Sequence, residues 1–374
     1  MADDDKKKPA PKKKKAAAKK KAAPKKKAAA KKAAPKSKPQ DKTINSPLDL
    51  HPSGRLILKD IDPRAWEHPT DRAALGALKQ IPGFDGLLRK FVGMFGEKNI
   101  ATIYTADAVR IGPKQYPDIH DSLVRVCEVL DTEVPPLYIS QTPMVNAGAV
   151  GMDNPFIVLN SSLIELASPE EVEVVLGHEV GHIMSEHALY RTLLFLLLAM
   201  SSRVAPVVGQ AALPIMYALL EWSRKAEISC DRAGLLAVQN LESAQGLHAV
   251  MAGGIRGRHD ELNVEAFVEQ ADEYRDLQGL AAYYRLMATL GRSHDFPVIR
   301  VAELRNWHES GEYEAILQGT YAKEGDDFSV AADWVATGKN FSKKAGQVFE
   351  DSDRYVNDAL NNFMNSAKKL WDDA

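Results

Sequence analysis

The segment LGHEVGH contains three residues, His178, Glu179 and His182, whose types and spacing suit metal-assisted hydrolysis. Two imidazoles four residues apart on a helix lie on the same face, so both can direct a nitrogen at one ion. Zn²⁺ suits such a pair because it accepts imidazole nitrogen at about 2.0–2.1 Å and has no redox chemistry. Glu179 follows the first histidine, where its carboxylate can take a proton from a metal-activated water and pass it to the leaving amine. The segment therefore predicts a zinc site with Glu179 as the catalytic base.

A catalytic zinc ion needs a third protein ligand, and the residues just after this motif do not provide one. A third histidine at the metzincin spacing would fall at position 188, which is Ala188, and Ser185 stands where that motif has glycine. The metzincin arrangement is thus excluded. His187 misses the required position by one residue, and on a continuing helix it would point away from the metal. We expect His187 to be a surface or packing histidine.

The segment SRKAEISCDRAG, residues 223–234, offers a better third ligand. Glu227 and Asp231 stand four apart on a predicted helix and so share a face. Glu227 is predicted to complete the set of ligands to one Zn²⁺, while Asp231 accepts the outer N–H of a ligand histidine and fixes its orientation. This is the gluzincin pattern. Cys230 points elsewhere and is predicted to be a small packing residue.

Helix and strand signals place these residues on regular elements. Residues 168–171, Ser-Pro-Glu-Glu, combine an N-cap serine, a proline at the first helical position and a glutamate three residues after the cap. They predict the start of the motif helix, within which Gly181 allows close approach of another backbone. Short strands are expected over residues 137–140 and 156–159, and a second helix over residues 221–237. The predicted fold class is α+β, mainly helical with a small sheet beside the motif helix.

An apolar region, residues 192–220, lies between the two motifs. Arg203 ends its first apolar run, and its second run contains Pro206 and Pro214. Because a bilayer crossing takes about 20 apolar residues, neither run is a convincing span. We expect a helical hairpin packed on the peptidase domain, and membrane insertion of a kinked span is the alternative.

The N-terminal residues differ in composition from the rest of the chain. Residues 1–42 contain 18 Lys against four Asp, a net charge of +14, so the remainder carries −16 of the total of −2. Repeated Lys, Ala and Pro predict a disordered tail over residues 1–45, which would attract a polyanion such as nucleic acid or an anionic membrane. This motivates a second hypothesis, a binding protein whose tail is the working part. The plain alternative is a solvated tail with no dedicated partner.

The overall composition is that of an ordinary soluble enzyme, with 45% hydrophobic and 26% charged residues among 374. Two cysteines imply no disulfide framework, and the N-terminus lacks the apolar stretch of a secretory signal. We therefore expect a cytoplasmic protein, with membrane association left open. The tail is expected to precede a zinc peptidase domain over residues 46–310 and a C-terminal helical extension over residues 311–374. Nothing in the sequence predicts the oligomeric state.

These motifs resemble the HtpX-like zinc metalloendopeptidases, the family that also contains the CAAX prenyl endopeptidases. The resemblance runs from about Asp118 to Arg300 and rests on PPLYI, NAGAVG, the strand ending in LN, HEVGH and SRKAEISCDRAG. It implies a zincin-like fold, the ligand and base roles given above, cleavage of protein or peptide substrates, and a role in protein quality control. It also suggests that Asn146 and Ala147 lie beside the cleft, where an edge strand can pair with an extended substrate. Turn chemistry is the alternative explanation of Asn146.

The chain departs from that family in two places. Several members have clear membrane-spanning helices at the N-terminus and between the motifs, whereas this N-terminus is Lys-rich. His294 and Arg300 lie near a His-Pro and Arg element of the family, but Asp295 and Phe296 separate His294 from Pro297. We expect a structural role for this pair, with transition-state donation as the alternative.

Overall fold

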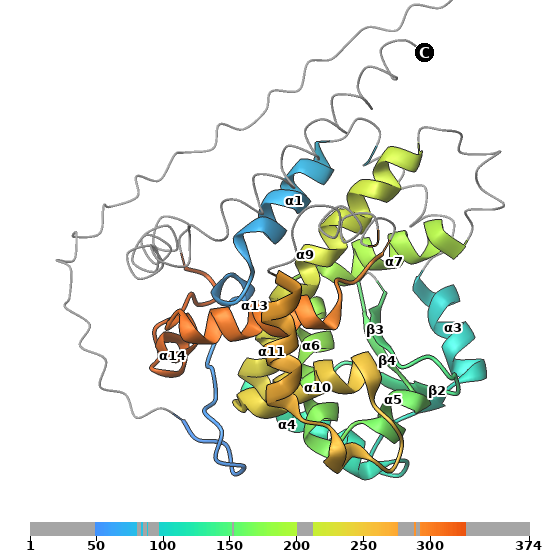
Figure 1. Ribbon diagram of the computed structural model, residues 1–374. Coiled ribbons are helices and arrows are strands. Elements are labelled where there is room, and N and C mark those ends of the chain that lie inside the picture. The colour runs from blue at the N-terminus through green and yellow to red at the C-terminus, as the bar shows by residue number, and fades with distance from the viewer. Residues whose placement is uncertain are drawn as a thin grey trace, which may run out of the picture. The chain divides into compact units, whose positions relative to one another are not determined.

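The computed structural model describes residues 49–80, 84, 88, 97–151, 153–199, 212–275, 288 and 292–326 (Figure 1). These residues form mainly helices, together with one small sheet. In chain order the helical elements are η1 (Pro63–Ala65), α1 (Pro69–Lys79), α3 (Glu97–Asp107), α4 (Pro117–Val129), α5 (Ser161–Leu166), α6 (Pro169–Met184), α7 (His187–Ala199), α9 (Ala212–Val238), α10 (Leu241–Gly253), η2 (His259–Glu261), α11 (Val264–Arg275), α13 (Pro297–Glu309) and α14 (Glu312–Leu317). The strands are β1 (Val109–Arg110), β2 (Leu137–Ser140), β3 (Ala147–Val150) and β4 (Phe156–Asn160).

The four strands form one mixed sheet in the order β1-β2-β4-β3. β2 and β4 run parallel, whereas β1 pairs antiparallel with β2 and β3 pairs antiparallel with β4. The strands predicted over residues 137–140 and 156–159 are confirmed, with Asn160 as one further residue of β4. β3 is an edge strand and contacts α6 and α7. A mainly helical structure with a small sheet beside α6 agrees with the predicted α+β class.

Helix α6 begins where the capping signal predicts. The Ser168 hydroxyl accepts a hydrogen bond from the Glu171 N–H at 3.3 Å, and the Glu171 carboxylate accepts one from the Ser168 N–H at 2.7 Å. Every residue from Glu171 to His182 is buried. A helix buried on all sides needs neighbours on all sides, and α4, α9, α10 and the sheet provide them. The predicted metal motif is therefore held inside the protein, on a rigid element.

Three glycines bring α6 and α9 into close contact. A Cβ added to Gly177 would lie 2.6 Å from the Cβ of Ala237, and one added to Gly181 would lie 2.6 Å from the Cβ of Ala233. On α9, a Cβ added to Gly234 would lie 2.9 Å from a backbone oxygen of α6. Packed interiors do not accommodate such distances, so side chains at these positions would force the helices apart. The expected role of Gly181 is confirmed, and the contact brings side chains of α9 within reach of the motif.

Helix α6 ends at Met184 and does not continue past the motif. Glu186 follows in the left-handed conformation, with φ of 57°, and α7 begins at His187 as a separate helix. The expectation that His187 lies on a continuing helix is therefore wrong. Because the chain turns at Glu186, the His187 side chain is buried, which excludes a surface histidine.

The larger apolar core combines residues of the sheet with residues of α4, α6, α9, α10, α13 and α14. Its members include Tyr313 and Ile316, which directly follow the predicted domain boundary at residue 310. The Lys-rich tail and the part of the C-terminal extension after residue 326 lie outside the described residues, so their predicted structure stays a prediction.

A smaller core joins α7 to α1 and to the N-terminal half of α9, through side chains such as Leu193 and Trp222. The described ends of the 192–220 region thus pack against each other, although residues 200–211 lie outside the described chain. Within the described ranges, none of the helices has the length and apolar character that crossing a membrane requires.

Candidate metal centre

The three predicted ligand side chains meet where α6 packs on α9. The Nε2 atoms of His178 and His182 lie 3.1 Å apart. The Glu227 carboxylate spans them, with Oε2 3.2 Å from His178 Nε2 and Oε1 3.3 Å from His182 Nε2. Ligand atoms around a tetrahedral zinc ion, each at about 2.0–2.1 Å from the metal, lie about 3.3–3.4 Å from one another. The contacts between these side chains are thus close to the distances between ligand atoms around zinc, and one ligand atom from each residue lies within 4.8 Å of the others.

The electrostatics of this cluster also suit a cation. Glu227 is 1% exposed, and within the described chain neither of its carboxylate oxygens accepts a hydrogen bond. Burial raises the pKa of this carboxyl group, but the nearby His294, Arg191 and Arg300 outweigh burial and hold the pKa of Glu227 well below its ordinary value. A buried ionised carboxylate is costly unless its oxygens are satisfied. Two imidazole nitrogens and one such carboxylate form a donor set that fits zinc.

His178 is held on its outer side by a carboxylate and an arginine. Its Nδ1 lies 3.0 Å from Asp231 Oδ1. Arg300 donates from Nε to Asp231 Oδ2 at 2.8 Å and from Nη2 to Oδ1 at 2.5 Å. Burial lowers the pKa of His178, yet the neighbouring carboxylates of Asp231 and Glu227 outweigh burial and raise the pKa to about 9 in the chain alone. The structure therefore brings Asp231 to a predicted ligand histidine, in a position to accept its outer N–H.

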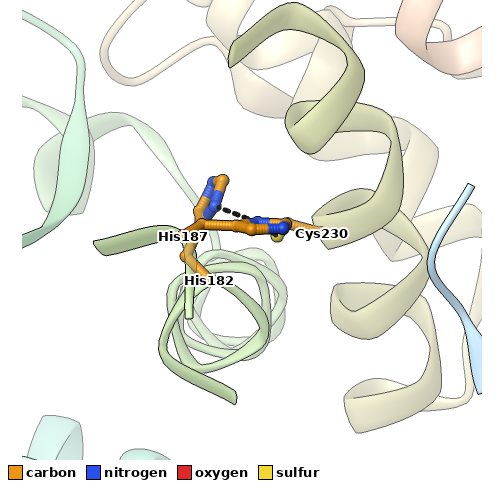
Figure 2. A group of neighbouring side chains, drawn as sticks. All are labelled: His182, His187 and Cys230. Carbon is orange, nitrogen blue, oxygen red and sulfur yellow. Dashed lines mark hydrogen bonds between the residues drawn. The ribbon is translucent and has the colours of Figure 1, made fainter. Parts of the chain in front are cut away.

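His182 has a different outer environment (Figure 2). Its Nδ1 lies 3.1 Å from Nδ1 of His187, and the other ring nitrogen of His187 lies 3.2 Å from Asp71 Oδ2 on α1. Cys230 Sγ lies 3.6 Å from His187 Nδ1. Burial raises the pKa of the Cys230 thiol well above its ordinary value, and the charges of Glu227 and Asp71 add to this effect. His182, His187 and Cys230 form a second group of metal-ligating atoms, all within 4.8 Å of one another.

Glu179 lies beside the predicted ligands and contacts the sheet. Its Oε2 accepts a hydrogen bond from the Ala149 N–H of the edge strand β3 at 2.7 Å. Arg191 of α7 lies 3.6 Å from the same oxygen and 3.5 Å from Glu227 Oε1. One arginine is therefore placed between the two carboxylates of the centre, and the backbone of β3 fixes the orientation of Glu179.

A small cavity of about 30 Å³ adjoins these side chains. Its lining includes Asn146, Ala147, His178, Glu179, Glu227 and His294. A cavity needs at least about 10–15 Å³ of such volume to hold a water molecule, so this one accepts water but not a peptide. Asn146 and Ala147 thus lie beside the centre, as does His294, whose Nε2 is 3.5 Å from Glu227 Oε1.

Sequence reasoning overlooked Arg191 and Asp71, and of its two alternatives for His187 the buried packing residue agrees with the structure while the surface residue does not. His187 and Arg191 are four apart, so a helix that restarts at His187 presents both on one face. The restart is hard to predict because Glu186, unlike glycine, rarely adopts the left-handed conformation that causes it. Asp71 lies far upstream on α1, and no local pattern connects it with the motif.

Comparisons with known proteins cover up to 70% of this chain. Residues 113–308 match the model of peptidase family M48. The chain is 35% identical to plastoglobule-localized metallopeptidase 48, chloroplastic, of Arabidopsis thaliana, over 70% of this chain and 78% of that protein. It is 31% identical to a protease HtpX homolog of Moorella thermoacetica, over 24% of this chain and 31% of that protein. It is also 31% identical to protease HtpX of Xylella fastidiosa, over 31% of this chain and 40% of that protein, so less than half of either HtpX protein is matched. No solved structure is significantly similar to the chain.

Proposed function

This chain belongs to peptidase family M48 and is a metalloendopeptidase, and we propose that it cleaves its substrates at a single zinc ion. The resemblance to the HtpX-like family that the sequence predicts is confirmed by these relatives. The proposed ligands are His178, His182 and Glu227. The proposed general base is Glu179. A zincin-like fold, with the ligands on two packed helices and a sheet edge beside them, is part of the proposal.

One observation carries this proposal, the meeting of two imidazoles and one carboxylate at the α6–α9 contact. The two Nε2 atoms lie 3.1 Å apart, and each lies 3.2 or 3.3 Å from one of the two Glu227 oxygens, distances close to those between ligand atoms around zinc. Both Glu227 oxygens are buried and accept no hydrogen bond from the described residues, although Arg191 and Arg300 lie 3.5 and 3.3 Å from them. A metal ion would satisfy both imidazoles and the carboxylate at once.

The side chains around the ligands have separate roles in the proposed reaction. A bound zinc ion would supply Lewis acidity, polarising the scissile carbonyl and lowering the pKa of a water to about 7. Glu179, oriented by the Ala149 N–H, accepts a proton from water in the adjoining cavity and returns it to the leaving amine. Asp231 keeps the proton of His178 on Nδ1, so that Nε2 is free to bind the metal. Arg300 holds the Asp231 carboxylate in place through two charge-assisted hydrogen bonds.

The edge of the sheet is the proposed substrate side. Asn146 and Ala147 line the cavity, and an extended peptide can add to an exposed sheet edge through its backbone. His294 also lines the cavity and its side chain is 31% exposed, which supports transition-state donation rather than a purely structural role. Arg300 is occupied by Asp231, which supports the structural role expected for it.

A housekeeping role in protein quality control follows from the family resemblance, and a cytoplasmic location is proposed with it. The name of the Arabidopsis relative places that protein at the plastoglobule of the chloroplast. Membrane association of this chain stays the alternative. Binding of a polyanion by the Lys-rich tail also stays a prediction, since the relatives' names and the described residues do not bear on it.

Metal content and cleavage of casein by the full-length protein test the proposal. We expect one zinc ion per wild-type chain, no zinc and no activity in Glu227→Ala, and retained zinc in Glu179→Gln. Loss of the general base should lower the rate of Glu179→Gln about 10²–10⁴-fold. His120→Gln on α4 is the matched control and should behave like the wild type. Full activity of Glu179→Gln, or full zinc content of Glu227→Ala, would refute the proposal.

A further inference from the structure

The outer side of His182 leads to two buried residues that the proposed function does not use. We propose that Asp71 and His187 act as a positioning relay for this ligand. In the relay, Asp71 accepts the Nε2–H of His187, and His187 accepts the Nδ1–H of His182 through its own Nδ1. The inference rests on the proposed function, because it concerns the orientation of a proposed zinc ligand.

Asp71 is the fixed end of the relay. It is 1% exposed, and α9 anchors it at two points. Trp222 Nε1 donates to Oδ1 at 2.9 Å, and the Ser229 hydroxyl donates to Oδ2 at 2.6 Å. An ionised carboxylate only accepts hydrogen bonds. Its third neighbour, His187 Nε2 at 3.2 Å, must therefore carry a proton.

The tautomers of both histidines follow from this anchor. A neutral imidazole with its proton on Nε2 has an acceptor lone pair on Nδ1. Two donors approach that lone pair of His187, namely His182 Nδ1 at 3.1 Å and the Cys230 thiol at 3.6 Å (Figure 2). The imidazole N–H is the nearer and the stronger donor, so His182 carries its proton on Nδ1. The Nε2 lone pair of His182 then faces His178 and Glu227, as metal binding requires.

Burial makes the relay necessary for orientation. The exposed fractions of His182, His187 and Asp71 are 0%, 1% and 1%, so water cannot replace a lost hydrogen bond. The competing explanation is a metal ion bound by His182, His187 and Cys230. Together with the proposed zinc site, it would require both ring nitrogens of His182 to bind metal at the same time, which demands an imidazolate that has lost its N–H proton. The relay requires only neutral rings and one carboxylate.

Two substitutions at one position separate the two bonds of the relay. In His187→Gln the longer amide can still donate to Asp71, but it offers no acceptor to His182. In His187→Asn the shorter side chain can place its oxygen near the former Nδ1 and accept from His182, but it does not reach Asp71. Leu123→Ala, which removes a core side chain of α4, is the control for general loss of stability.

The measurements are zinc affinity, by competition with a chromogenic chelator, and the visible spectrum of the cobalt-substituted full-length protein. We expect His187→Gln to bind zinc about 10–100-fold more weakly and to alter the cobalt spectrum. His187→Asn should recover most of the affinity, and Leu123→Ala should bind zinc like the wild type.

Wild-type zinc affinity in His187→Gln would overturn the relay, as would equal losses in His187→Gln and Leu123→Ala. If the wild type bound a second equivalent of zinc and only the His187 variants lost it, the relay would be overturned in favour of a metal ion bound at His187. Failure of the proposed function has a different signature, because the zinc content would then be unaffected by Glu227→Ala.

Discussion

The two histidines of the HExxH motif stand one helical turn apart and are supported in different ways. On the α9–α13 side, His178 contacts the Asp231 carboxylate directly, and the charged Arg300 clamps that carboxylate. On the α1–α7 side, His182 contacts a second ring, His187, which in turn contacts a carboxylate.

The chemical difference lies in what surrounds each carboxylate. Asp231 is paired with a buried cation, whereas the other donors to Asp71 are the neutral groups of Trp222 and Ser229. Loss of a charged partner leaves a buried charge, and loss of a neutral partner leaves only an unsatisfied dipole. We therefore expect the Asp231 contact with His178 to contribute more to the free energy of unfolding than the Asp71 contact with His187. Both should affect the affinity for the metal.

The largest expected effect is that of Asp231→Ala. It removes the two hydrogen bonds that Arg300 donates to Asp231 and leaves Glu227, 3.3 Å from Nη2, as the nearest carboxylate to this buried cation. Breaking a buried ion pair in this way costs about 3–5 kcal/mol. Urea unfolding of chelator-treated protein measures this cost. Asp231→Asn keeps one acceptor and should lose less. Equal stability of the wild type and Asp231→Ala would contradict the importance of the direct support.

One source of acid sensitivity lies on the same side. Burial lowers the pKa of His248, which lies 3.6 Å from Asp231 Oδ2, from 6.5 to about 4. Between pH 4 and pH 6.5, His248 is protonated in the unfolded chain but not in the folded chain. The contribution of neutral His248 to the free energy of unfolding is therefore complete above pH 6.5 and is lost as the pH falls toward 4. It amounts to about 3 kcal/mol, at roughly 1.4 kcal/mol per pKa unit. Replacing His248 by Gln should flatten this part of the curve of unfolding free energy against pH, and an unchanged slope would count against it.

Asp71→Ala should have a smaller effect on stability. The groups left behind are an indole N–H, a hydroxyl and an imidazole N–H. The hydroxyl can rotate and the imidazole can change tautomer, so the indole N–H is the donor that stays unsatisfied, at a cost of about 1–3 kcal/mol. The same urea series measures it. If Asp71→Ala destabilised the protein as much as Asp231→Ala, the distinction between charged and neutral support would be wrong.

The sequence was a good guide wherever one helix sets the geometry. The capping box at Ser168 and the four-residue spacings of the histidines and of Glu227 and Asp231 are local patterns, and the structure shows the helices that they predict. It also brings these side chains together, although their roles remain proposals. The contact of His182 with His187 and Asp71 was not predictable, because it depends on the left-handed conformation of Glu186 and on packing by the distant α1.

The smallest expected effect concerns that left-handed residue. Glu186 is exposed and has φ of 57°, a conformation that costs a non-glycine residue about 1 kcal/mol. Glu186→Gly should raise the free energy of unfolding by about 0.5–1 kcal/mol, because glycine suits the position after a helix end. Glu186→Ala is the control and should bring no such gain. A less stable glycine variant would show that Glu186 has contacts worth more than its strain.

The same turn changes how a short motif is best searched. A search based on helical spacing assumes that the motif helix continues past its second histidine. It therefore rejects a histidine five residues later, because on a continuing helix that side chain would point away from the metal. Where the helix ends before that histidine, as it does at Met184 ahead of the left-handed Glu186, the histidine lies inside the protein and against the proposed metal site. In such chains, the pattern HExxH followed by four residues and a histidine marks a candidate residue for orienting the second motif histidine. A search for this pattern should also look for a residue that ends the motif helix.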